Sequence, residues 1–188
     1  IKHFLDSLTI TLAIKQNAGK LHVIDVGTGA GIPGLPLKIL LPEIRLTLLE
    51  ATAKKAGFLK HVVTRMGFDE VVVAVGRAED LAHENDYREK SDVALGRGVA
   101  PLVTLVELTL PFCKLGGCLI AQKKGNIEAE INRAARAIKV LGGKLKKVQK
   151  IELEELNDNR CLVVIDKVLP TPPQYPRRPG VPAKSPLI

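Results

Sequence analysis

Aromatic side chains are scarce in this chain of 188 residues, which has no tryptophan, two tyrosines and four phenylalanines. Proteins that hold single-stranded nucleic acid by stacking use several aromatic rings, so the composition argues against a stacking platform. A long apolar run is also missing, and no signal peptide is visible. The sequence therefore favours a globular protein without a membrane partner.

Cysteine is also rare. Cys113, Cys118 and Cys161 show neither metal-ligand spacing nor a C-x-x-C pair. An odd number of cysteines in this arrangement favours reduced, buried structural thiols, and hence a cytoplasmic location. We therefore expect no metal site.

Positive charge, by contrast, is abundant, with a formal net charge of +8. A basic protein of this size often meets a polyanion, although charge alone does not say which one. The length suits one domain with a sizeable core, and a monomer is the default expectation. Because the chain begins at Ile1 rather than at methionine, we expect the N-terminal segment to be incomplete.

Strand-like and helix-like segments alternate from residue 21 onward. Apolar runs predict strands at 21–26, 44–50, 70–75, 91–98 and 118–123. Capping and periodicity predict helices at 33–41, 52–67, 101–117 and 126–143, with Thr52 and Gly67 bounding the second and Gly116 and Gly117 ending the third. The segment 76–90 is expected to be a loop. Two later strand-like runs, KLKKVQKIEL and NRCLVVIDKV, are typical of a closing antiparallel pair. This order favours an α/β fold with a mostly parallel sheet and helices on both faces.

The last 21 residues, 168–188, differ in composition from the rest. They hold seven of the twelve prolines and three basic residues, Arg177, Arg178 and Lys184, but no acidic residue. Such a segment is not expected to form regular secondary structure. We therefore predict one domain over 1–167, followed by an extended basic strap that contacts the body or a partner.

The segment HVIDVGTGAGIPGLPL, residues 22–37, places four glycines directly after a strand-like run. Ligands of doubly wound sheets bind beyond the carboxyl ends of the strands, where glycines let the backbone approach them closely. Two ligands are compatible with the spacing. Residues 29–34 match the G-x-G-x-x-G of a dinucleotide site, and residues 25–31 match the shorter loop of an S-adenosylmethionine site.

The residues around the glycine loop favour S-adenosylmethionine. Glu50 ends the second strand, where it could accept hydrogen bonds from the ribose of either ligand. Asp25 would repel a pyrophosphate and attract the ammonium group of methionine. Ala78 and Glu79 follow the third strand, where an adenine edge would lie.

A NAD-dependent oxidoreductase remains as an alternative. It would need a proton donor such as a Tyr–Lys pair, and Tyr87 and Tyr175 lie in a predicted loop and in the tail.

Seven short segments occur in the order expected of one family: IKHFLDSL, DVGTGAGIPGLPL, TLLEATAKKAGFL, GRAED, GRGVAPL, KKG and YPRRPGVPAKSPL. Together they resemble the RsmG (GidB) family of bacterial ribosomal RNA methyltransferases, from Lys2 to Leu187. The resemblance implies a class I, Rossmann-like methyltransferase fold. It also implies transfer of a methyl group from S-adenosylmethionine to N7 of guanine 527 in 16S rRNA, free or within the small ribosomal subunit.

The resemblance also implies roles for particular residues. Gly27, Ile32, Ala78, Glu79 and Arg97 would belong to the cofactor pocket, and the glycine-loop argument adds Gly29, Gly31 and Glu50. Arg97 would lie beside the target base, and His3 and Asp6 would border the same cleft.

Methyl transfer to guanine N7 needs alignment of the reactants rather than proton transfer, because N7 has a lone pair and carries no proton. We therefore expect Arg97 to position the base, with no acid–base catalyst. The candidates for RNA contact are basic: Lys54, Lys55, Lys123, Lys124, Arg177 and Arg178. A methyltransferase of another specificity and a non-enzymatic RNA-binding domain are further alternatives.

Overall fold

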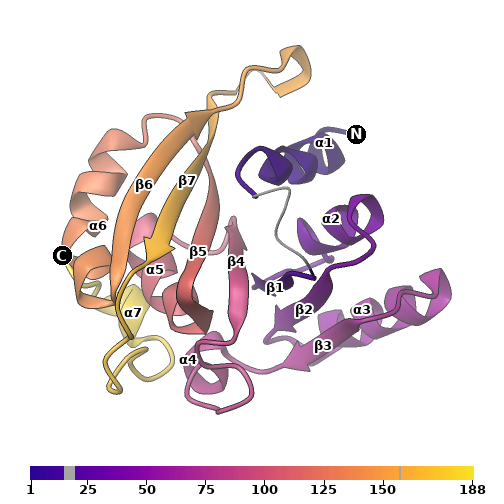
Figure 1. The fold of residues 1–188 in the computed structure, drawn as a ribbon, viewed down its shortest axis with the longest axis horizontal. Coiled ribbons are helices and arrows are strands. Elements are labelled where there is room, and N and C mark those ends of the chain that lie inside the picture. The colour runs from indigo at the N-terminus through magenta and orange to yellow at the C-terminus, as the bar shows by residue number, and fades with distance from the viewer. Residues whose placement is uncertain (15–19, 157) are drawn as a thin grey trace.

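A seven-stranded sheet crosses the computed structural model of the chain, which describes residues 1–14, 20–156 and 158–188 (Figure 1). The strands are β1 His22–Val26, β2 Arg45–Glu50, β3 Val71–Val75, β4 Ser91–Arg97, β5 Cys113–Lys124, β6 Gly143–Lys150 and β7 Arg160–Lys167. Their order in the sheet is β3-β2-β1-β4-β5-β7-β6. Among the strands of the described residues, β7 alone runs opposite to the other six, so the predicted mostly parallel sheet with a closing antiparallel pair is confirmed.

Helices cover both faces of the sheet. They are α1 Lys2–Leu8, α2 Gly34–Leu40, α3 Ala53–Met66, α4 Ala78–Leu81, α5 Leu102–Thr109, α6 Glu128–Val140 and α7 Val181–Lys184, with 3-10 helices at Thr9–Leu12, Leu110–Phe112 and Glu154–Leu156. In Figure 1, α4 to α7 lie together on one side and α1 to α3 on the other. No helix in the described ranges is long and apolar enough to span a membrane.

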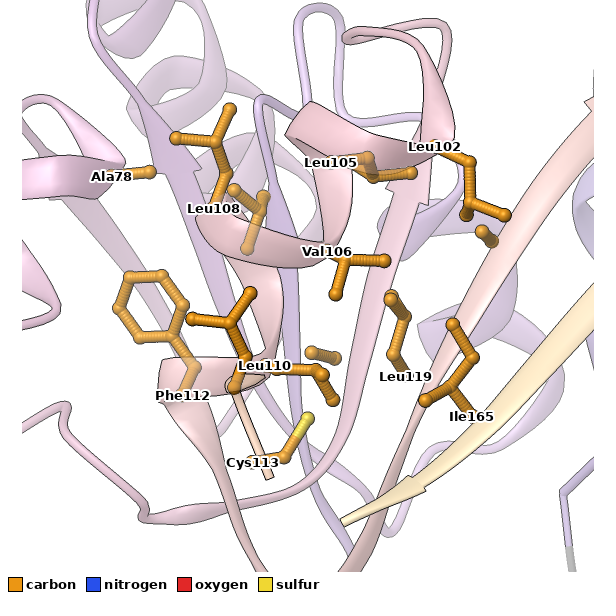
Figure 2. Close-up of a cluster of buried hydrophobic side chains, with 14 of the residues drawn as sticks. Ala78, Leu102, Leu105, Val106, Leu108, Leu110, Phe112, Cys113, Leu119 and Ile165 are labelled. Carbon is orange, nitrogen blue, oxygen red and sulfur yellow. The ribbon is translucent and has the colours of Figure 1, made fainter. Parts of the chain in front are cut away.

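Two clusters of buried apolar side chains hold these layers together. In the larger one, Leu105 and Val106 of α5 pack toward Leu119 of β5 and Ile165 of β7 (Figure 2). The central strands β1, β2 and β4 are mostly apolar because both of their faces are covered. This explains why their predicted bounds agree closely with the structure. β3 is an edge strand and only partly buried, but its run of β-branched valines is also typical of a strand.

The predicted helix 101–117 is wrong at its C-terminal end. The α-helix ends at Thr109, a 3-10 turn follows, and β5 begins at Cys113, opposite Ser91. Pro111 lacks the N–H that a continuing helix needs, whereas Gly116 and Gly117 lie within the strand rather than closing a helix. The segment 76–90, expected to be a loop, contains the single turn α4.

The other predicted helices lie within three residues of their predicted ends. Thr52 and Gly67 flank α3 as predicted, with Gly67 in the left-handed region at φ 62°. The Thr52 side chain, however, makes no capping hydrogen bond.

Two of the three cysteines, Cys113 and Cys161, are buried, and Cys118 is partly buried. Burial raises the pKa of the Cys113 and Cys161 thiols, which keeps both sulfurs protonated and unreactive at neutral pH.

The tail from residue 168 onward folds back along the body. Arg88 donates hydrogen bonds to the carbonyl oxygens of Thr171 (2.8 Å) and Tyr175 (2.9 Å). The fully buried carboxylate of Glu107 accepts three hydrogen bonds from Arg177, at 2.7 to 2.9 Å. The expectation that the tail forms no regular secondary structure is wrong, because the tail contains the helical turn α7. Pro182 fits this turn because it lies at an early position that needs no N–H.

Candidate functional site

A cleft of about 700 Å³ opens at the carboxyl ends of β1, β4 and β5, beside the first residue of the antiparallel β7. Its lining comes from six separate segments: His3, Asp6, Gly27, Thr28, Gly29, Ala30, Ile32, Lys55, Arg97, Gly98, Gln122, Lys123, Lys124 and Arg160. The cleft is therefore built where parallel α/β sheets bind their ligands.

The glycine loop after β1 gives the cleft an open backbone wall. Gly29 has φ +63°, and no atom lies within 4 Å of the position that a Cβ would occupy. A side chain here would be strained and would project into free space beside the backbone. Gly27 and Ile32 also line the cleft, whereas Gly31 does not and instead packs against Leu35.

Asp25 holds this loop from the inside. Its Oδ2 accepts hydrogen bonds from the Thr28 hydroxyl (2.6 Å) and the Gly34 N–H (2.8 Å), and the side chain is buried. Burial raises the pKa of this carboxyl group to about 6. The carboxylate does not line the cleft, and its bonds make it an internal support of the loop. Its attraction for the ammonium group of a ligand stays a prediction.

Glu50 at the end of β2 is a second brace for the loop. Its Oε2 accepts a hydrogen bond from the Gly29 N–H (3.1 Å), and its Oε1 accepts one from the Thr52 N–H (2.8 Å). The side chain is buried against the loop rather than lining the cleft. Each carboxylate oxygen retains a second lone pair with which it could accept from a ligand hydroxyl.

Ala78 and Glu79 lie in the first turn of α4 and do not line the cleft. Ala78 packs into the hydrophobic core. Glu79 is buried and bonds to Arg77 (2.8 Å) and to the Gly180 N–H of the tail (3.1 Å). Burial opposes ionisation of Glu79, but these bonds hold its pKa below the ordinary value. The Glu79 side chain thus ties the tail to the loop after β3.

One carboxylate links three segments at the mouth of the cleft. Asp6 Oδ2 contacts Arg97 Nε of β4 (2.8 Å) and Arg160 Nη1 of β7 (2.5 Å). Arg97 Nη2 donates to His3 Nδ1 (2.8 Å), which must accept because a guanidinium can only donate. The structure therefore brings His3, Asp6 and Arg97 together, although 91 positions separate Asp6 from Arg97.

Sequence reasoning missed two members of this cluster. Arg160 is nearly buried, and Gln122 Nε2 donates to the Asp6 carbonyl oxygen (2.6 Å). The sequence did offer one indication of Arg160, which is the first residue of the apolar run RCLVVID. An arginine at the start of a buried strand needs a carboxylate partner.

The predicted RNA-contacting lysines occupy different surroundings. Lys55, Lys123 and Lys124 line the cleft, whereas Lys54 lies on the exposed surface of α3 outside it. Lys123 is held by the Ala100 carbonyl oxygen (2.9 Å) and Glu130 (2.8 Å), with 13% of its side chain exposed. Lys123 thus has a structural partner, and Lys55 is the more available charge.

Lys124 and the tail arginines complete the predicted set. Lys124 pairs with Asp158 (2.8 Å), and hydrogen bonds from Arg160 and Lys124 hold the pKa of Asp158 well below its ordinary value. Arg177 donates hydrogen bonds from its guanidinium group to the buried Glu107, whereas the neighbouring Arg178 is exposed. The structure therefore gives Arg177 an internal role and leaves Arg178 free to meet solvent.

The cleft is suited to holding an electron-rich partner rather than to covalent catalysis. In the described ranges its lining has no cysteine or serine, and its one hydroxyl group, that of Thr28, is bonded to Asp25. No group of three or more His, Cys, Asp or Glu side chains in these ranges is arranged to hold a metal ion.

Solved structures with the same fold include TrmN from Thermus thermophilus, with a TM-score of 0.64 at 18% identity over 87% of this chain and 48% of that one. Another is a mutant of MtNAS in complex with S-adenosylmethionine, with a TM-score of 0.65 at 16% identity over 89% and 63%. These similarities confirm the predicted class I methyltransferase fold.

Sequence relatives are much more similar. The ribosomal RNA small subunit methyltransferase G of Dehalococcoides mccartyi is 54% identical over the whole chain, which covers 79% of that protein. Its counterpart in Moorella thermoacetica is 50% identical over 99% of the chain and 77% of that protein. The family model described as "GidB: rRNA small subunit methyltransferase G" matches residues 1–160. The chain therefore belongs to the GidB family of ribosomal RNA small subunit methyltransferases.

Proposed function

We propose that the chain methylates N7 of one guanine in 16S rRNA, nucleotide 527, with S-adenosylmethionine as the methyl donor. The observation that carries the proposal is the juxtaposition of an open glycine loop and the anchored Arg97 in one cleft. Membership of the GidB family supports the same activity.

The residues around the glycine loop fit this cofactor. Gly29 presents open backbone, and the lone pairs that Glu50 retains suit ribose hydroxyls. When bound, S-adenosylmethionine supplies an electrophilic methyl group on a positively charged sulfur. Gly27, Gly29 and Ile32 would hold it from the cleft, and Glu50 from behind the loop.

Arg97 is held ready to position the base. Asp6 occupies its Nε and His3 occupies its Nη2, so that within the described part of the chain Nη1 has no hydrogen-bond partner. A fixed guanidinium with a free N–H can donate to guanine O6 or to a flanking phosphate. N7 carries no proton, so the cleft needs no general base.

The partner in this proposal is 16S rRNA or the small subunit that contains it. We infer that the enzyme acts on it as a monomer in the cytoplasm, without a membrane partner. The exposed Lys54, Lys55, Lys124 and Arg178 are the basic side chains best placed to meet phosphates.

The first experiment is calorimetric titration with S-adenosylmethionine and, separately, with NADH. We expect binding of S-adenosylmethionine only, and binding of NADH alone would overturn the proposal. Methyl transfer is then measured on 16S rRNA and on small subunits by mass spectrometry of nuclease fragments. The matched control is the same RNA with adenine in place of guanine 527, which must remain unmethylated. A methyl group elsewhere would assign a different specificity.

A further inference from the structure

The outward face of α3 carries a basic and aromatic stripe. Lys54, Phe58, His61 and Arg65 are spaced i, i+4, i+7 and i+11, which places them on one side of a helix. All four are exposed, Phe58 by 52%. We call these four residues the α3 stripe.

The stripe lies opposite the face by which α3 joins the fold. Ala56 and Leu59 are the buried residues of the helix, and they pack toward the sheet. Figure 1 shows α3 at one edge of the molecule, beside β3, the outermost strand on that side. The stripe is therefore free to meet a partner.

The stability of the fold does not account for these side chains. α3 contains no acidic residue, and its first turn carries Lys54 and Lys55, where the helix dipole disfavours cations. Within the described residues, Lys54 and Arg65 have no ion-pair partner. The stripe thus combines an exposed aromatic ring with cations that have no ion-pair partner among the described residues, and surfaces that bind single-stranded nucleic acid use this combination.

The stripe also continues from the cleft. Lys55 lines the cleft at the N-terminal end of α3, one residue from Lys54. From there the helix extends for about 16 Å to Arg65, at 1.5 Å per residue. A strand that leaves the cleft past Lys55 therefore meets the stripe along its length.

We propose that the α3 stripe binds the RNA strand adjoining the target nucleotide. Lys54 and Arg65 contact phosphates, and Phe58 stacks on a base or ribose. This inference rests on the proposed function, because it takes the RNA substrate from it. The shortage of aromatic residues argued against a platform of several stacking rings. The α3 stripe needs only one such ring, that of Phe58.

Two of the four lysines of β6 provide a contrast on the same molecule. Lys146 pairs with Asp166 (3.0 Å), and Lys147 donates to the Gln149 side chain (2.7 Å). Lys54 and Arg65 of the stripe have no ion-pair partner among the described residues. The stripe also adjoins the cleft through Lys55, which favours α3 as the surface that meets the RNA.

The test compares two double variants of equal charge loss. Lys54→Gln with Arg65→Gln removes the stripe's cations, and Arg133→Gln with Lys139→Gln removes two exposed cations from α6, on the opposite side of the molecule (Figure 1). Affinity for a 16S rRNA transcript and for small subunits is measured over a range of KCl concentrations. The stripe variant should bind about tenfold more weakly, with a salt slope smaller by about 2. In the α6 variant, the loss of RNA affinity and the change in salt slope should each be less than half as large.

Phe58 is tested separately. Phe58→Ala should weaken RNA binding about tenfold with an unchanged salt slope, because stacking releases no counterions. Phe58→Tyr keeps a ring of the same shape and should restore the affinity.

Four outcomes would overturn the α3 stripe as the RNA site. They are equal losses in the two double variants, an unchanged salt slope in the stripe variant, no effect of Phe58→Ala, and a parallel loss of S-adenosylmethionine affinity in calorimetry. Failure of the proposed function looks different, because the wild-type protein would then bind RNA through α3 without methylating it.

Discussion

At the mouth of the cleft, the carboxylate of Asp6 contacts two arginines that come from different strands. Its side chain is 5% exposed, and that of Arg160 is 6% exposed. A buried carboxylate between two guanidiniums gains full-strength hydrogen bonds, because water does not compete for them. Asp6 therefore fixes α1 on the sheet and Arg97 in the cleft at the same time.

Asp6→Asn should lower the free energy of unfolding by about 2 kcal/mol, since it removes the charge shared by two buried hydrogen bonds. Urea denaturation measures this change, and methyl transfer should fall with it because Arg97 loses its anchor. The matched control is Asp158→Asn. Asp158 also pairs with Arg160, but its side chain is 42% exposed, so its loss should cost much less. Equal losses in the two variants would contradict the role given to Asp6.

Asp25 should make stability depend on pH. Burial raises the pKa of its carboxyl group from 3.8 to about 6, so the folded state favours the protonated form. The resulting stabilisation is fully present below about pH 4 and is lost as the pH rises through 6. The unfolding free energy of the wild type relative to Asp25→Asn should therefore fall by about 3 kcal/mol between about pH 4 and pH 7. A difference that does not change with pH, in urea titrations at each pH, would show that Asp25 keeps its ordinary pKa.

Some of these residues could be identified from the sequence and others could not. Motif resemblance singled out His3, Asp6 and Arg97, which the structure places in contact. Arg160 carries no motif, and its pairing with Asp6 spans 154 positions of the chain. A contact of that kind depends on the order of the strands in the sheet, which no local pattern encodes.

Among the elements, the C-terminal tail shows how two adjacent arginines can differ. Arg177 is held by three hydrogen bonds to Glu107, whose carboxylate is fully buried. A few residues on, the Gly180 N–H donates to Glu79 beside the loop after β3. The tail is therefore fastened to the body at two points, one on α5 and one on α4.

Arg177→Ala should release the tail and lower the free energy of unfolding by about 3 kcal/mol, because Glu107 is left as a buried, unpaired charge. Limited proteolysis should then cleave after residue 168. Arg178→Ala is the matched control, because this neighbour is exposed and its loss should leave stability unchanged. If Arg178→Ala destabilised the protein more than Arg177→Ala, Arg177 would not be the arginine that holds the tail to the body.

Hydrophobic pattern predicted most elements because each central strand is buried on both faces and stands out as an apolar run. It failed at 113–117, where Gly116 and Gly117 suggested the end of a helix. The pairing of β5 with β4 decides that region instead: Cys113 lies opposite Ser91, with an irregular register before Val93. Tertiary pairing overrides local propensity at such a position.

Taken as a whole, the molecule is strongly basic, with a net charge of +8. Binding of RNA releases counterions, whereas binding of S-adenosylmethionine, which has no phosphate, releases few. Raising KCl from about 50 to about 200 mM should therefore reduce kcat/KM for 16S rRNA by at least about tenfold. The KM for S-adenosylmethionine should stay nearly constant in the same assays. Equal salt effects on both substrates would show that the charge does not serve RNA binding.

The position of β7 has a consequence for how the protein is made. β7 lies between β5 and β6 in the sheet, yet the chain contains it after both. During synthesis β6 emerges before the one strand with which it pairs, and Arg160, the first residue of β7, is also missing from the cleft. The cleft is thus completed only after β7 has followed β5 and β6 out of the exit tunnel.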